Sequence, residues 1–275
     1  MPALVSELTA WRQLDPPVRI GPPAPGTITL RDLATVRGYE QVTAGLADLD
    51  LTGRSVQLTP LHLANWAVME LLVRPLFHDE TWITASAPQL GFALKSAGEI
   101  PELWLAPDVL VAADPGPAAA GTQIGELLAP VTGTVTRCSR IHERAVATIA
   151  AESATAGLFR TARSAGRPDD ADWLDVASAA VARALGARVT TDRLRSRPDD
   201  GPAVVFPARS LCCVLNARTS WHSCPGCPKT GSASEQARDA TRWLAAMGEE
   251  EFLDTTGRPK GSRDSHRTTI TRRDP

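Results

Sequence analysis

The chain has 275 residues, 43% of them hydrophobic, which is an ordinary globular proportion and excludes general disorder. Its 29 basic and 31 acidic residues give a formal net charge of −2, and this balance gives no indication of a nucleic-acid partner. The sequence starts without a basic stretch followed by an apolar one, and no segment reaches about eighteen uninterrupted apolar residues, so we expect neither a secretory signal nor a membrane span. These features predict a cytoplasmic protein, in a compartment that keeps thiols reduced.

Helical spacing of apolar residues dominates the first part of the chain. Residues 1–15 are expected to form a short amphipathic helix that ends at a segment rich in Pro and Gly. Helical spacing returns over 29–50. The stretch "LTPLHLANWAVMELLVRPLF" is apolar around most of its circumference, so we expect a helix in the centre of the core. We predict Thr59 as its N-cap, Pro60 at its first helical position and Pro75 at its end.

The pattern changes to short apolar or alternating runs between residues 81 and 113. These runs are "TWITAS", "GFALK", "ELWLA" and "DVLVAA", and Pro, Gly and Asp separate them. Such a pattern is typical of an antiparallel meander.

Helical spacing resumes after the meander. We expect helices over 121–131 and 140–162, and a third over 169–186 with an aspartate N-cap and a glycine stop. "AVVF" predicts a strand just before a group of cysteines, and "SASEQARDATRWLAAMG" predicts a helix after it, with Ser and Glu at capping-box spacing.

These elements together predict an α+β fold: a mostly helical body with a small antiparallel sheet and a C-terminal segment with four cysteines. We expect three regions. Residues 1–200 form the helical body with the β-meander, 201–248 form the cysteine segment and its closing helix, and 249–275 form a disordered tail, because that tail has no apolar periodicity.

Four of the five cysteines lie within sixteen positions, in the pattern C-C-x10-C-x2-C formed by Cys212, Cys213, Cys224 and Cys227. Four thiolates can hold either zinc or an iron–sulfur cluster. Structural zinc sites favour two C-x2-C turns, whereas here two cysteines are adjacent, and neighbouring side chains of an extended chain point to opposite sides. A two-iron cluster accommodates an adjacent pair more easily than a single small ion does, so the pattern favours the cluster and leaves zinc as the alternative.

This pattern, followed by Pro228 and preceded by Arg209, resembles the C-terminal signature of the FhuF-like ferric siderophore reductases. In that family the four cysteines hold a [2Fe–2S] cluster. The resemblance therefore implies a cytoplasmic enzyme that reduces a ferric siderophore by one electron, with Cys212, Cys213, Cys224 and Cys227 as cluster ligands and residues 1–200 as the siderophore-binding part. It covers about twenty residues of the chain.

Two other functions stay open, an electron carrier with a [2Fe–2S] cluster and a protein partner, and a binding module stapled by zinc. No phosphate-binding or dinucleotide fingerprint is visible, so we expect an electron donor outside the chain. Peripheral attachment to the inner membrane is also left open.

Several residues near the cysteines are candidates for tuning a metal centre, and each also has an ordinary interpretation. Arg218 could offset an anionic cluster or be a solvated loop residue, and His222 could bond to a sulfur or be an exposed loop residue. Cys138 is expected to be a small buried apolar residue on a helix. His62 and His142 lack a partner at metal-binding spacing. Candidate walls for a siderophore pocket are Trp66, Trp82, Trp104 and Trp173.

Overall fold

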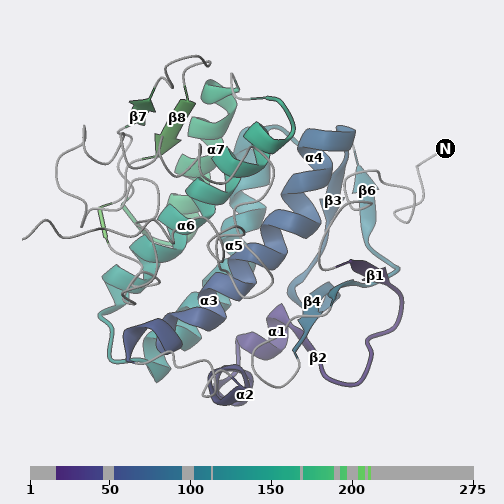
Figure 1. The fold of residues 1–275 in the computed structure, drawn as a ribbon, viewed down its shortest axis with the longest axis vertical. Helices are drawn as coiled ribbons and strands as arrows, with labels where there is room; N and C mark the ends of the chain where they lie inside the picture. Colours follow the sequence, from purple (N-terminus) through teal and green to yellow (C-terminus); the bar gives the residue numbers. More distant parts are fainter. Residues whose placement is uncertain are drawn as a thin grey trace, which may run out of the picture.

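Helices form most of the structure, a computed structural model that describes residues 17–45, 53–94, 102–112, 114–167, 170–188, 193–196, 204–207 and 210–211. Strands β1 to β6 lie on one side of the helices, and β7 and β8 lie on the other side, next to α6 (Figure 1). The bounds of the shorter helical elements are α1 Leu30–Leu33, α2 Val36–Gly45 and the 3-10 turn η5 Ala87–Gln89.

A nearly continuous helical rod runs through the core. It consists of α3 (Arg54–Val68), a π-helical turn η4 (Met69–Val73) and α4 (Arg74–Asp79). Every residue of η4 is buried, so the prediction of a central helix is confirmed. A π-turn widens the helix by one residue, and such turns are frequent at functional sites.

The predicted limits of this rod are wrong at both ends. The helix begins at Arg54, and Pro60 lies inside it, where Thr59 donates its hydroxyl to Ser55 O at 2.8 Å. Proline removes one backbone hydrogen bond, but the leucines on both sides of it are fully buried, and their packing outweighs the local signal. Pro75 lies in the first turn of α4, where a missing N–H costs little, and the rod ends where Glu80 turns left-handed at φ 52°.

Three long helices pack beside the rod, and all three were predicted. They are α5 (Pro117–Cys138), α6 (Glu143–Ser164) and α7 (Ala171–Ala184). Gly186, at φ 62°, follows the end of α7 as expected. The packing of α5 on α7 is close enough that a Cβ on Gly121 would lie 2.2 Å from the carbonyl oxygen of Ala177.

The strands are short, and the predicted strands are present, but their pairing is not that of a meander. The bounds are β1 Val18–Ile20, β2 Thr27–Thr29, β3 Trp82–Thr84, β4 Leu90–Ala93, β5 Leu103–Leu105, β6 Leu110–Ala112, β7 Arg193–Ser196 and β8 Val204–Pro207. One sheet has the order β1-β5-β4-β2, in which β1 and β5 are parallel; β3 pairs with β6 and β7 with β8, both antiparallel. The main sheet is therefore mixed rather than antiparallel.

The strand order differs from that of a meander because β1 and β2, which precede the helical rod in the chain, join the sheet. β2 pairs with β4 and leads directly into α1, whose N-cap Thr29 forms a reciprocal capping box with Asp32. β3 and β6 are then left to pair with each other. The α+β class with a mostly helical body is confirmed.

Several predictions lie outside the described residues. They are the N-terminal helix over 1–15, the helix after the cysteines, the tail 249–275, and the four clustered cysteines themselves. In the parts of the chain that are described, no helix combines the length and apolar character needed to cross a membrane.

Candidate functional site

The candidate metal ligands begin one residue after the last described segment, Ser210–Leu211. Cys212, Cys213, Cys224 and Cys227 all lie outside the described residues, as do Arg218 and His222. Among the residues that the structure does describe, no group of three His, Cys, Asp or Glu side chains is placed to hold a metal ion. The structure therefore bears on the candidate site through the contacts of Ser210 and Leu211, the two residues that directly precede the first cysteine.

Glu152 binds both of these residues. It lies in the middle of α6 and is only 2% exposed. One carboxylate oxygen accepts hydrogen bonds from the backbone N–H of Ser210 at 2.7 Å and from its hydroxyl at 2.6 Å, and the other accepts from the backbone N–H of Leu211 at 3.3 Å. A carboxylate buried in this way requires such donors, because leaving it without them would cost several kcal/mol, on the order of the penalty for an unpaired buried charge.

Local packing fixes the two residues that Glu152 bonds. Strand β8, which ends at Pro207, lies against α6. The side chain of Leu211 is partly buried and packs on the hydrophobic core. The chain that enters the cysteine segment is thus attached to the helical body by both apolar contact and three hydrogen bonds.

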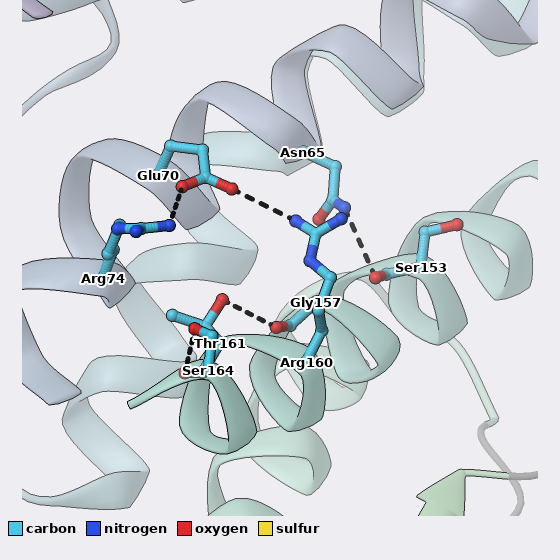
Figure 2. Close-up of polar contacts among 8 residues, drawn as sticks. All are labelled: Asn65, Glu70, Arg74, Ser153, Gly157, Arg160, Thr161 and Ser164. Carbon is cyan, nitrogen blue, oxygen red and sulfur yellow. Dashed lines mark hydrogen bonds and ion pairs between the residues drawn. The ribbon is translucent and has the colours of Figure 1, made fainter. Parts of the chain in front are cut away.

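The turn of α6 that carries Glu152 is itself tied to the central rod. Asn65 on α3 donates its Nδ2 to the backbone carbonyl of Ser153 at 3.3 Å (Figure 2). Both residues are buried, at 8% and 6% exposure. Within the described ranges, Asn65 Oδ1 and Ser153 Oγ have no hydrogen-bond partner. The interface between α3 and α6 therefore contains two buried polar atoms that the described part of the chain leaves unsatisfied.

An ion-pair group lies one to two turns further along α6. Glu70, in the π-turn, contacts Arg74 at 3.3 Å and Arg160 of α6 at 3.4 Å (Figure 2). The side chain of Glu70 is 11% exposed and those of the two arginines are 21% exposed. Gly157 lies between these levels, and a Cβ there would come within 2.6 Å of Met69 Cγ. The rod and α6 are therefore held in close contact from Ser153 to Arg160, directly after Glu152.

Cys138 is the one cysteine that the structure describes. It is the last residue of α5, with a free and partly buried thiol that packs against the core, as expected for a small apolar residue. Tyr39 lies close to it, and burial, with a smaller effect of Cys138, raises the pKa of the Tyr39 phenol.

Two of the described histidines, His142 and His78, lie at helix ends. His142 is the N-cap of α6, where its Nδ1 accepts from the backbone N–H of Arg144 at 3.2 Å. His78 lies inside α4, in its last turn. Its pKa is lowered, first by partial burial and then by the charge of Arg74.

The four candidate tryptophans differ in burial, and Trp66 and Trp173 are only partly buried. Trp82 and Trp104 are buried, and each indole N–H is bonded inside the protein, to Gln123 Oε1 at 3.0 Å and to Gly21 O at 2.8 Å. Trp173 is partly buried and makes an edge contact with Phe77. Trp82 and Trp104 therefore belong to the hydrophobic core, which is what their large apolar area favours.

Sequence reasoning missed Glu152. A signal was present: this is the one acidic residue between Glu143 and Asp169, and it interrupts the alanine-rich run "AVATIAAESATAGLF". A single carboxylate on the buried side of an apolar helix predicts a specific partner elsewhere in the chain. The sequence alone does not indicate that this partner adjoins the cysteines.

The donor set suits a metal or cluster by its chemistry. Four thiolates are soft ligands, of the type that zinc and iron–sulfur centres take. The two residues that precede them are bonded to Glu152 of the helical body. A scan against models of known protein families gives no match to this chain, and a search of curated proteins gives none either.

Proposed function

We propose that this chain is a ferric siderophore reductase whose [2Fe–2S] cluster is held by Cys212, Cys213, Cys224 and Cys227. The observation that carries the proposal is the cysteine pattern, four thiolate donors within sixteen positions with an adjacent pair and a C-x2-C turn. The bonds from Ser210 and Leu211 to Glu152 support it, because they join the start of this donor set to a large folded body.

The reaction follows from the difference between the two oxidation states of iron. When bound, the cluster supplies one electron at a time, which is what reduction of Fe(III) to Fe(II) requires. Hydroxamate or catecholate oxygens are hard ligands that hold Fe(III) tightly and Fe(II) weakly. Transfer of one electron to the ferric complex therefore releases the metal and leaves the chelator intact, and the electron comes from a protein or small reductant outside the chain.

The helical body has a separate role in this proposal. Its described part alone extends over most of residues 17–188, which is more than an electron carrier requires to surround a cluster. We assign it the task of binding the ferric complex and of keeping the metal-binding segment in place. The proposed location is the cytoplasm, where thiols remain reduced for cluster assembly, and peripheral attachment to the inner membrane is compatible with it.

The first test is spectroscopic. We expect protein purified without oxygen to be coloured, to contain two iron and two acid-labile sulfide per chain as the formula [2Fe–2S] requires, and to give the EPR signal of one reduced [2Fe–2S] centre after dithionite. Cys224→Ser is expected to lose the colour, whereas the matched variant Cys138→Ser retains it because that thiol lies outside the donor set at the end of α5. A colourless chain with one zinc ion would refute the redox proposal.

The second test separates a reductase from an electron carrier. The reduced, coloured protein is mixed with a ferric hydroxamate or a ferric catecholate, and Fe(II) is trapped with a colorimetric chelator. A carrier would instead reduce a protein such as a cytochrome and leave both ferric complexes intact. Reduction of the protein acceptor alone would replace the present proposal with the electron-carrier function.

A further inference from the structure

Glu152 differs from the other buried polar groups of the described chain in what it bonds. Asn65 bonds the α6 backbone and Glu70 bonds neighbouring arginines, so both connect helices of the body. Glu152 uses both of its carboxylate oxygens on Ser210 and Leu211, which directly precede the adjacent cysteines.

We propose that Glu152 is a positioning residue for the Cys212–Cys213 pair, and this inference rests on the proposed function. Cys212 directly follows Leu211 in the chain. The hydrogen bonds to the N–H groups of Ser210 and Leu211 fix the direction of the chain at this point. The two residues that precede the cysteine pair therefore have a defined place beside α6.

The helix beneath this contact is braced against movement. On the residue next to Glu152, the Ser153 carbonyl accepts from Asn65 of α3. Further along, Gly157 admits Met69 without a Cβ between them, and Arg160 reaches Glu70 (Figure 2). Ligands are held more accurately when the groups that position them stand on packed helices rather than on loops.

The charge of Glu152 has a second consequence for the same cysteines. A carboxylate close to a metal centre disfavours addition of an electron, because reduction increases the negative charge of the centre. Replacing Glu152 by the neutral, nearly isosteric glutamine removes that charge while it keeps the volume. We therefore expect the midpoint potential of the loaded protein to rise in Glu152→Gln.

The hydrogen bonds give a readout that requires no metal. Glutamine offers one carbonyl oxygen in place of two acceptors, so Glu152→Gln loses either the bonds from Ser210 or the bond from Leu211. In the metal-free chain, we expect the amides of Ser210 and Leu211 to exchange hydrogen roughly five- to tenfold faster in this variant, the effect of about one hydrogen bond. Glu126→Gln, an exposed position on α5, serves as the matched control.

Two further variants separate positioning from simple loss of folding. Ser210→Ala removes the hydroxyl bond and keeps the charge and both backbone bonds, so it should release the metal faster to a chelator without raising the potential. Glu152→Asp keeps the charge and shortens the side chain, and it should restore the wild-type potential more fully than the exchange rate. Both readouts remain interpretable if Glu152→Gln fails to fold.

The outcomes distinguish this inference from the proposed function. Slow exchange at Ser210 and Leu211 that is lost in Glu152→Gln, with a raised potential, supports it. Fast exchange at both amides in the wild-type chain overturns it whether or not a cluster binds. A loaded wild type whose potential and metal retention are unchanged in Glu152→Gln overturns the positioning role alone, whereas a chain that assembles no cluster overturns both.

Discussion

Gly121→Ala tests how closely α5 and α7 are packed. A Cβ at residue 121 would lie 2.2 Å from the backbone oxygen of Ala177 and 2.9 Å from the Cβ of Ala180. Neither atom is the end of a flexible side chain, so the two helices must separate to admit one methyl group. Gly133 lies on the same helix, and there the nearest atom to an added Cβ is Arg137 Nη1 at 3.6 Å, an ordinary contact.

Both substitutions increase helix propensity, and they differ in how much steric overlap the added methyl group creates. Replacing glycine by alanine inside a helix stabilises by about 0.5–1 kcal/mol. Overpacking typically costs about 1–3 kcal/mol, and a backbone contact at 2.2 Å belongs at or above the top of that range. We therefore expect Gly121→Ala to lower the free energy of unfolding by about 2 kcal/mol and Gly133→Ala to raise it by up to about 1 kcal/mol.

Urea unfolding followed by tryptophan fluorescence and far-ultraviolet circular dichroism measures both effects at once. The comparison requires equal denaturant slopes, so that a shift of the midpoint reports stability alone. A Gly121→Ala protein at least as stable as the wild type would refute the close contact between the helices. Failure of Gly133→Ala to stabilise would instead question the helix term that both estimates use.

Two other changes follow from single contacts. Trp82→Phe removes the indole donor from Gln123 Oε1 inside the core, so we expect a loss of about 1–3 kcal/mol in urea unfolding, and an unchanged midpoint would show that this bond contributes nothing. The folded-state pKa of His78 is lowered, chiefly by partial burial and then by Arg74, so the unfolded chain binds its proton first as the pH falls through about 6.5. The free energy of unfolding is therefore unaffected by His78 above that pH and decreases below it. His78 is only partly shielded from solvent, so screening should limit the decline to a few tenths of a kcal/mol. His78→Asn should flatten it, and an identical pH profile would contradict the assignment.

The sequence predicted the helices well where local and tertiary signals agree. The three helices after residue 116 have regular apolar spacing, and Gly186 follows the last of them. The central rod is where these signals conflict. Thr59 and Pro60 form a standard start signal, yet the helix begins at Arg54, because burial of the flanking leucines outweighs one lost backbone bond.

Long-range partners were beyond the reach of sequence patterns. The strands "LWL" and "LGFA" were found, but their neighbours β1 and β2 come from a region rich in Pro and Gly that gave no strand signal. Glu152 is a similar case. The apolar sequence around it indicates a buried carboxylate, which requires hydrogen-bond donors. Only the fold shows that Ser210 and Leu211 supply them. The cysteine pattern itself was legible because its spacing is local.

The parallel pairing of β1 with β5 has a consequence for the order in which the chain acquires its fold. During synthesis, Val18–Ile20 leaves the ribosome long before Leu103–Leu105, its partner in the sheet. The central rod, at residues 54–79, emerges in between and can begin to form from local contacts. We therefore expect nascent chains that stop before residue 103 to hold helix without the four-stranded sheet, and β1 to be the strand of this sheet that waits longest for its partner.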